Sequence, residues 1–225
     1  MSRPVIVITG GHGALGSAVA KAAGEAGWTV AIIDHARHGA EGADMTLSGV
    51  DLTEAGQAMQ VMQAIAEQLG RIDALLNIAG GFVWQTTEDG DPAAWGRMHA
   101  LNVTTTLNAS RAALPWLKQA PDGRIVNVGA AGAQKAAAGM GAYAASKAGV
   151  HRLTESLAEE LKDTSVTVNA VLPSIIDTPA NRADMGEENA HKWVKPADLA
   201  AVMLFLASPA ARAITGALIP VTGRV

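Results

Sequence analysis

Two residues with complementary proton chemistry, Tyr143 and Lys147, stand four positions apart in the stretch Ala-Tyr-Ala-Ala-Ser-Lys that ends at Lys147. On a helix this spacing places both side chains on one face, about one turn apart. An ammonium held near a phenol favours the phenolate, so we expect the pKa of Tyr143 to lie below its usual value of about 10. Such a tyrosine can exchange a proton with a carbonyl or an imine. The spacing also fits a packed tyrosine beside a solvated lysine, so the surrounding elements decide between the two.

A glycine-rich turn lies far upstream of this pair. The stretch Thr-Gly-Gly-His-Gly-Ala-Leu-Gly, residues 9–16, follows an apolar strand and opens a helix. Glycines at such a turn let the backbone approach a pyrophosphate, which then lies on the helix N-terminus. We therefore expect a dinucleotide site, whose residues in the turn are Gly10, Gly13, Ala14, Leu15 and Gly16.

An acidic residue, Asp34, ends the second apolar run. A carboxylate at this place can accept hydrogen bonds from the ribose hydroxyls of adenosine and would repel a 2′-phosphate. The sequence therefore favours NAD(H) over NADP(H) as the cofactor. The nearby His35, Arg37 and His38 complicate this choice, and we interpret all three as parts of a solvated loop.

Strand and helix patterns alternate along the whole chain, which predicts an α/β fold with a doubly wound parallel sheet. We expect one domain over residues 1–225, because this length suits one full α/β core. Residues 174–195 look irregular or only partly helical, as in a substrate lid or an oligomer contact. Apolar runs predict strands over 5–9, 29–34, 45–50, 74–78, 124–128, 166–172 and 217–221. Helical spacing predicts helices over 14–26, 53–69, 93–118 with a possible break, 143–162 and 196–207.

Composition narrows the partners and the compartment. A net charge of −4 gives no basic surface for nucleic acid, and the longest apolar run, 199–207, is too short to span a bilayer. The chain has no Cys, which is compatible with a cytoplasmic protein, and an early first strand leaves no room for a signal peptide. Hydrophobic residues make up 49% of the chain although aromatic ones make up only 4%. We therefore expect apolar surface buried between subunits of a homodimer or homotetramer.

Further motifs occur in an order typical of one enzyme family. They are Asp51-Leu52, Asn77-Ile-Ala-Gly80, Asn102, the pair Tyr143 and Lys147, and the stretch from Pro173 to Thr178. With the glycine turn, they make the chain resemble the short-chain dehydrogenase/reductase family over essentially its whole length. The resemblance implies a Rossmann-like sheet of seven parallel strands. It also implies cofactor contacts from Asp51, Leu52, Asn77, Ala79, Gly80, Tyr143, Lys147, Pro173, Ile176 and Thr178.

The resemblance assigns roles to some of these residues. Asp51 would lie near the adenine, and Ile176 and Thr178 would hold the nicotinamide carboxamide. Asn102 would anchor a water in a proton relay through Lys147 and the cofactor ribose. Two structural interpretations stand beside these roles: a capping box between Asp51 and Glu54, and a buried Asn102 that satisfies a helix break.

The main departure from the family pattern is Ala130. Family members usually carry a Ser thirteen residues before the catalytic Tyr, where it donates a hydrogen bond to the reacting oxygen. Loss of one such donor costs roughly 3 kcal/mol of transition-state stabilisation, or about 10²-fold in rate. Ser146 projects elsewhere on the helix from Tyr143, so it is no obvious replacement. Smaller departures are Gly13, one place early in the turn, and Ile78, where the family usually has Asn.

One branch of the family, the dihydropteridine reductases, also lacks this Ser and resembles the chain in several motifs. These enzymes reduce quinonoid dihydropterins with NADH, and a quinonoid C=N acceptor needs an oxyanion donor less than a ketone does. The matching motifs are the glycine turn, Ala79-Gly-Gly-Phe82, Gly129-Ala130, Gly139-Met140, Val150-His151, Asp177 to Arg182, Met185 and Trp193.

We accordingly expect hydride transfer from NADH to a quinonoid or imine-like small molecule, with Tyr143, Lys147 and Asn102 as catalytic residues. A flat heteroaromatic acceptor could stack on aromatic side chains. The expected substrate-pocket residues, which could instead be core or interface residues, are Ala130, Phe82, Trp84, Met140, Met185 and Trp193.

Other functions remain open. One is a carbonyl reductase or alcohol dehydrogenase that works without the Ser, and another is a non-catalytic NAD(H)-binding protein. Metal catalysis is not expected, because the six His residues show no paired ligand spacing. We interpret His99 and His151 as surface or interface residues.

Overall fold

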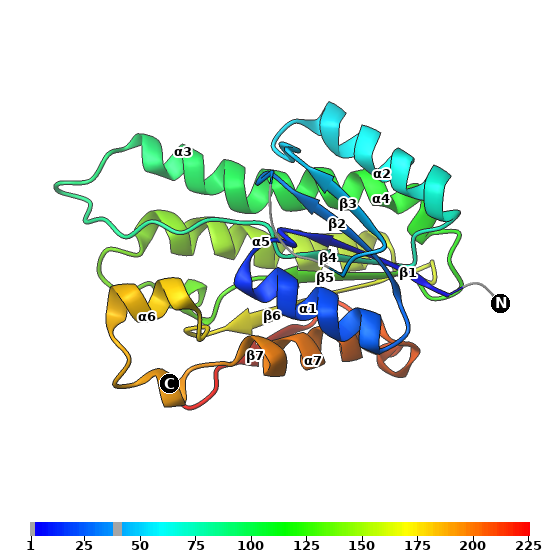
Figure 1. The fold of residues 1–225 in the computed structure, drawn as a ribbon. Coiled ribbons are helices and arrows are strands. Elements are labelled where there is room, and N and C mark those ends of the chain that lie inside the picture. Colours follow the sequence, from blue (N-terminus) through cyan, green and yellow to red (C-terminus); the bar gives the residue numbers. More distant parts are fainter. Residues whose placement is uncertain (1–2, 38–41) are drawn as a thin grey trace.

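Seven parallel strands form one sheet in the order β3-β2-β1-β4-β5-β6-β7 (Figure 1). The computed structural model describes residues 3–37 and 42–225. The strands are β1 (Val5–Thr9), β2 (Thr29–Asp34), β3 (Met45–Ser48), β4 (Ala74–Asn77), β5 (Arg124–Val128), β6 (Thr167–Pro173) and β7 (Leu218–Val221). The helices are α1 (Ala14–Glu25), α2 (Ala55–Leu69), α3 (Ala93–His99), α4 (Thr105–Leu117), α5 (Gly141–Glu160), α6 (Pro179–Met185) and α7 (Pro196–Ala207). The predicted parallel α/β sheet is confirmed.

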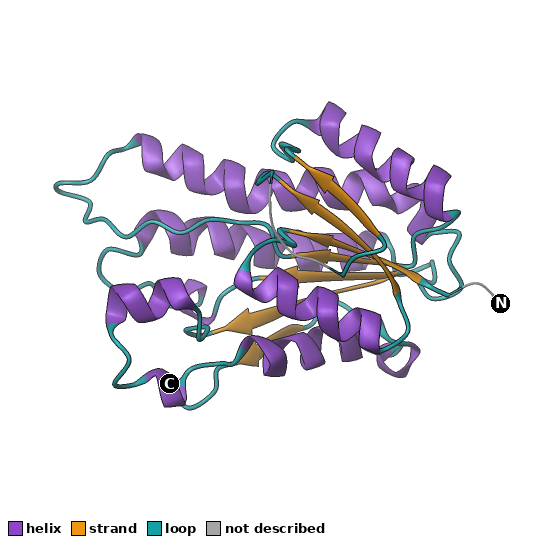
Figure 2. Ribbon diagram, viewed as in Figure 1, coloured by secondary structure: helices purple, strands orange, loops and turns teal. Residues whose placement is uncertain are grey.

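The strand β1 shows why both faces of the sheet are covered. All five of its residues are buried, as expected for a strand with helices on either side. Successive side chains point to opposite faces, so Val5 and Val7 pack in the core layer that includes α2, α4 and α5. Ile6 and Ile8 pack in the opposite layer with α1 and α7. Figure 2 shows the resulting three layers, with the strands between two sets of helices.

The strand order places several loops together. The strand β1 pairs with β2 on one side and with β4 on the other. The order in which the chain adds strands to the sheet therefore reverses between β1 and β4. In such sheets ligands bind outside the carboxyl ends of the strands, at the reversal point. All strands point the same way, and the loops after β1, β4 and β5 therefore share this edge with α6 (Figure 1).

The long helix expected after Pro92 has the break that its sequence allowed. It divides into α3, a π-helical turn over Ala100–Thr104, and α4. Side-chain hydroxyls bond to carbonyl groups of this turn: Thr105 Oγ1 donates to Leu101 O at 2.7 Å, and Thr106 Oγ1 donates to Asn102 O at 2.8 Å. Such turns are often found at functional sites. The segment 174–195 is partly helical, as expected, with α6 and a 3₁₀ turn at Ala190–Lys192.

The predicted start of α2 was wrong by two residues. The capping box between Asp51 and Glu54 is absent from the structure. The helix begins at Ala55, and Glu54 at its N-cap makes no side-chain cap bond. Asp51 instead accepts two hydrogen bonds from Thr53, from the backbone N at 2.9 Å and from Oγ1 at 2.7 Å. The Asp51 carboxylate therefore stabilises a local turn instead of capping the helix.

No helix in the described part of the chain, residues 3–37 and 42–225, is both long and apolar enough to cross a membrane.

Candidate functional site

The glycine turn after β1 is packed too closely for side chains at several positions, of which Gly10 and Gly16 contact backbone. Gly10 has φ 68°, and a Cβ there would lie 2.8 Å from Ala79 N. A Cβ at Gly16 would lie 2.1 Å from Gly10 O. Gly13, in contrast, has room for a Cβ, with Gly10 O at 3.4 Å as its nearest neighbour. The turn therefore keeps its close approach between strand, turn and helix although Gly13 departs from the usual spacing.

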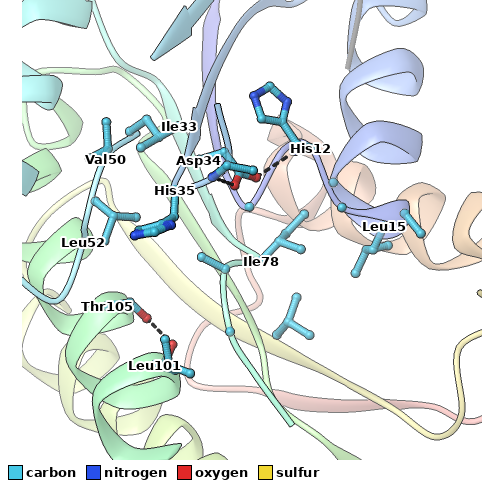
Figure 3. A pocket seen from close by; sticks show the side chains of 18 of the residues that line it. His12, Leu15, Ile33, Asp34, His35, Val50, Leu52, Ile78, Leu101 and Thr105 are labelled. Carbon is cyan, nitrogen blue, oxygen red and sulfur yellow. Dashed lines mark hydrogen bonds between the residues drawn. The ribbon is translucent and has the colours of Figure 1, made fainter. Parts of the chain in front are cut away.

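A cavity of about 820 Å³ opens beside this turn. Figure 3 shows His12 and Asp34 in one part of the cavity, Leu101 and Thr105 in another, and Ile78 between them. Most of the expected cofactor residues line it: Gly10, Gly13, Ala14, Leu15, Gly16, Asp34, Asp51, Leu52, Ala79, Gly80, Ile176 and Thr178. The volume and the bare glycine backbone fit a dinucleotide at a helix N-terminus.

The Asp34 carboxylate faces the cavity and organises the turn. Its Oδ2 accepts a hydrogen bond from His12 N at 2.9 Å, and its Oδ1 accepts one from Ala36 N at 2.8 Å (Figure 3). His35 and Arg37 are exposed, as expected for a solvated loop, whereas His38 lies outside the described residues. Asp34 therefore lines the cavity at the end of β2.

The pKa of Asp51, which also lines this part of the cavity, is lowered. The main cause is its pair of hydrogen bonds from Thr53, and His35 contributes a smaller electrostatic effect. Asp51 is therefore held as a carboxylate, able to accept further hydrogen bonds.

Four expected cofactor residues do not line the cavity that the described residues form: Asn77, Tyr143, Lys147 and Pro173. Asn77 is buried at the end of β4, where its Nδ2 donates to Ser110 Oγ at 3.0 Å and to Asn127 Oδ1 at 2.8 Å. It therefore links the sheet to α4. The backbone after it is held by Thr9 Oγ1, which accepts hydrogen bonds from Ile78 N and Ala79 N, both at 3.1 Å.

Lys147 is buried on α5, with 6% of its surface exposed. Its Nζ donates a hydrogen bond to Val128 O at 2.7 Å, at the end of β5. Burial lowers the pKa of Lys147 to about 8. The same cause raises the pKa of Tyr143 to about 12. Our expectation of a lowered Tyr143 pKa is therefore wrong for the cofactor-free protein, because desolvation outweighs the charge of a lysine that bonds to Val128 O.

Asn102 joins α5 to the loop after β4. It is fully buried in the π-helical turn, and its Nδ2 donates to Ser146 Oγ at 2.9 Å and to Gly81 O at 3.0 Å. Gly81 N in turn donates to Asn102 Oδ1 at 2.9 Å. A Cβ at Gly80 would lie 2.5 Å from Asn102 Oδ1 and 3.4 Å from Lys147 Nζ, so the cavity wall at Gly80 adjoins both side chains. Ser146 Oγ donates to Tyr143 O at 2.7 Å, which directs it to the helix backbone.

Aromatic side chains stand beside Tyr143. The Phe82 ring meets the Tyr143 ring edge to face, with centroids 5.0 Å apart. The Trp84 Nε1 donates to Ala138 O at 3.1 Å, and a Cβ at Gly139 would lie 2.2 Å from the Trp84 ring. Met140, half-buried, directly precedes α5. The loop after β4 thus packs against the segment that leads to Tyr143.

None of the six expected pocket residues lines the described cavity, and three of them also lie away from the Phe82–Tyr143 contact. Trp193 is 6% exposed, so it is a packed residue rather than an open pocket wall. Met185 is exposed at the end of α6 and does not line the described cavity, and Ala130 is buried just after β5. Trp95, which the sequence did not single out, packs near Gly141, where a Cβ would lie 3.3 Å from its ring.

Several cavity residues were not predicted, and some of them stand within or next to the recognised motifs. Leu101 and Thr105 belong to the π-helical region, and His12 sits inside the glycine turn. The others are Ile33, His35, Ala36, Val50, Thr53, Ile78, Val128, Pro179 and Ala180. Adjacency in sequence to Asp34 or Asp51 could have indicated Ile33, His35 and Val50.

His151 is not at the surface, contrary to our expectation. It is 3% exposed, and its Nε2 accepts a hydrogen bond from Ala130 N at 3.3 Å. Its position on α5, two turns after Tyr143, directs it toward β5 rather than outward. His99 is exposed on α3, as expected.

The chain is similar to known proteins over nearly its whole length. The sequence profile of the short chain dehydrogenase family matches residues 4–189. The 2-(S)-hydroxypropyl-CoM dehydrogenase 3 of Xanthobacter autotrophicus is 33% identical over 99% of this chain and 96% of its own length. The 3-oxoacyl-(acyl-carrier-protein) reductase FabG of Vibrio cholerae is 31% identical over 97% of this chain and 96% of its own.

A solved structure shares the fold. The 3-ketoacyl-(acyl-carrier-protein) reductase from Brucella melitensis, solved in complex with NADH, superimposes with a TM-score of 0.89 at 29% identity. The superposition covers 99% of this chain and 98% of the reductase chain. None of these three relatives is named as a dihydropteridine reductase.

Proposed function

We propose, from the premise that this chain belongs to the short-chain dehydrogenase family, that it reduces quinonoid or imine-like acceptors with NADH. The chain is an NAD(P)-dependent oxidoreductase that acts on small molecules. The acceptor class and the choice of NADH are the parts that we add.

The observation that carries the proposal is Ala130 at the end of β5. Its side chain is a methyl group, and its backbone N is already engaged with His151 Nε2. The hydroxyl of Ser146 is engaged with Tyr143 O, so it does not take the place of a donor from position 130. A ketone gains negative charge on one oxygen during reduction and depends on such donors. A quinonoid or imine-like system spreads the charge over several atoms and depends on them less.

The residues around Tyr143 suit reduction. With a pKa of about 12, the phenol keeps its proton throughout the neutral range and can donate it to the acceptor. A bound nicotinamide cofactor supplies the hydride. Gly80 lets the backbone pack closely against Lys147 and Asn102, and Gly81 N donates to Asn102 Oδ1. We assign to Lys147 and Asn102 the relay that returns a proton to Tyr143.

Phe82 and Trp84 support a flat acceptor. Both are more than half exposed, and Phe82 touches the Tyr143 ring. A planar heterocycle could stack on this surface next to the proton donor. A quinonoid dihydropterin is therefore the first acceptor that we would test. We also propose that residues 174–195, which contribute Ile176 and Thr178 to the cavity, act as a substrate lid.

A ketone reductase or alcohol dehydrogenase is the second candidate. It is favoured by the relatives' names, since two of them are reductases of oxoacyl or ketoacyl groups. The direct test follows NADH oxidation with quinonoid dihydropterin generated in situ, then with quinones, imines and ketones. Rapid turnover with ketones alone would overturn our acceptor class. Tight NADH binding with no turnover on any acceptor would instead favour a non-catalytic binding protein.

The variant Ala130→Ser separates the two enzyme functions. A new hydroxyl donor should raise ketone reduction about 10²-fold, since that is the usual effect of one oxyanion donor. Reduction of a quinonoid acceptor should change by less than about threefold, because it depends less on this donor. We would measure kcat/KM for both acceptors in the wild type and the variant. Equal effects on both acceptors would show that the missing donor does not set the acceptor class.

Asp34 is expected to select NADH. Replacing it by Ala should weaken NADH binding roughly tenfold and reduce discrimination against NADPH, because the carboxylate no longer meets the ribose hydroxyls or repels a 2′-phosphate. Fluorescence titration with both cofactors measures this. Asp44→Ala is a matched control, since Asp44 also accepts a backbone hydrogen bond, from Val30 N at 2.8 Å, but does not line the cavity. Unchanged selectivity in Asp34→Ala would remove Asp34 from this role.

We retain the prediction of a cytoplasmic homodimer or homotetramer. Apolar side chains that are more than two-fifths exposed support the oligomer, because they leave surface for another subunit to cover. They lie on several helices and include Met59, Trp95, Leu107 and Phe205.

A further inference from the structure

One face of α5 makes two hydrogen bonds with the end of β5 and the residues that follow it. Tyr143, Lys147 and His151 recur every four residues, so they share this face. Lys147 Nζ donates to Val128 O at 2.7 Å, and Ala130 N donates to His151 Nε2 at 3.3 Å. The two hydrogen bonds lie on either side of Gly129. The catalytic helix is thus tied to the strand end by one bond to a carbonyl and one from an amide.

Gly129 makes the contact with His151 possible. A Cβ at Gly129 would lie 2.5 Å from His151 Nε2, closer than real Cβ contacts allow, and 3.4 Å from Leu172 Cδ1. The imidazole therefore packs directly against the strand backbone, and it is almost fully buried. The ring and the glycine fit one another, so a change on either side should disturb the same contact.

We propose that His151 is a positioning residue of the active site, whose imidazole accepts the Ala130 N–H and holds the end of β5 in register with Tyr143 and Lys147. Ala130 has no polar side chain to orient this strand end, so the backbone bond to His151 takes on that task. An imidazole nitrogen accepts a hydrogen bond only when it carries no proton. The proposal therefore requires a neutral ring with its proton on Nδ1.

The surroundings of His151 favour a neutral ring. Burial is the main cause that lowers the pKa of His151, and the positive charges of Arg152 and Lys147 lower it further. The ring is therefore uncharged at pH 7, as the hydrogen bond from Ala130 requires.

The first test is the tautomer of His151, and it needs no substrate. Long-range ¹⁵N–¹H NMR on the cofactor-free protein distinguishes the two ring nitrogens, and His151→Gln assigns the signal among the six His residues. We expect a neutral ring with the proton on Nδ1 at pH 7.5. A proton on Nε2, or a charged ring, would overturn the proposal.

The second test uses turnover and relies on the chain's oxidoreductase activity with whichever acceptor the wild type reduces. His151→Leu keeps the bulk but removes the acceptor atom, and should lower kcat about tenfold, as misplacement of a catalytic surface does. His151→Gln offers a carbonyl acceptor, and its kcat should lie within about threefold of the wild-type value. The Kd for NADH should change less than about twofold in both. His99→Leu, at an exposed site on α3, is the matched control and should behave as the wild type.

Gly129→Ala approaches the same contact from the strand side and covers the case in which His151→Leu does not fold. It should lower kcat about tenfold with little change in the Kd for NADH. Equal losses of kcat in the Leu and Gln variants, or wild-type turnover in both His151→Leu and Gly129→Ala, would contradict a positioning role.

Discussion

Replacing Tyr143 by Phe should reduce turnover about 10²–10⁴-fold and leave the Kd for NADH within about twofold of the wild type. The variant loses only the phenolic hydroxyl, so the proton donor disappears while the ring remains. Because the edge-to-face contact with Phe82 needs the ring alone, local packing should persist. The measurement compares NADH oxidation by wild type and variant with the best acceptor, and it requires a parallel binding titration.

Tyr143 offers a second, direct observation because it is the single Tyr of the chain. Phenolate absorption in a pH titration of the cofactor-free protein therefore reports this residue alone. We expect the phenol to stay protonated until the pH approaches 12, since burial holds its pKa there. The Phe variant gives the baseline. A variant that keeps full turnover, or a wild-type phenol that ionises near neutral pH, would require another proton donor or another cause of its ionisation.

The fold was predictable from local patterns. Buried parallel strands such as β1 are continuous apolar runs, and helices such as α1 show helical spacing and stop near glycine. These signals are local, so their order along the chain was enough to predict a parallel α/β sheet. Asp34 ends a strand of such a sheet, so its place in the cavity was predictable, whereas several of its cavity neighbours were not predicted.

Distances across the fold were not predictable in the same way. The sequence places His151 on the helix of Tyr143, but only the position of β5 shows that the ring meets Ala130 rather than solvent. Asn77 stands at the end of a strand near the cofactor site, yet its amide turns inward to Ser110 and Asn127. In both cases the side chain's partner is distant in sequence, so its direction depends on tertiary packing.

The same reason explains the error in the pKa of Tyr143. Helical spacing correctly placed Lys147 one turn away, but the pKa depends on which group the ammonium approaches and how much water remains. Lys147 bonds to Val128 O, and desolvation then acts on both residues in opposite directions, since it disfavours the charged form of each. Burial of Tyr143 and Lys147 therefore carries an energetic cost that the sequence does not show.

Lys147→Met should make that cost measurable, by stabilising the protein near pH 7 while it lowers turnover roughly 10²–10³-fold. In the folded protein the pKa of Lys147 falls from 10.5 to about 8. This drop corresponds to roughly 3 kcal/mol of unfavourable free energy for a charged, buried lysine. Met removes this term, but it also leaves Val128 O without its donor, which costs about 1–2 kcal/mol. We therefore expect a net gain of about 1–2 kcal/mol in the free energy of unfolding at pH 7.

The pH dependence gives the sign of the effect without relying on that net value. Between pH 8 and 10.5 the unfolded chain binds more protons at this residue than the folded one, so the wild type should gain stability as the pH rises. The advantage of Lys147→Met should accordingly shrink or reverse across this window. Urea unfolding at pH 7 and near pH 10 measures it, with Lys118→Met as an exposed control on the same type of substitution. A difference between wild type and Lys147→Met that stays constant with pH would mean that Lys147 is not desolvated in the folded protein. A lowered pKa of Lys147 would then need another physical cause.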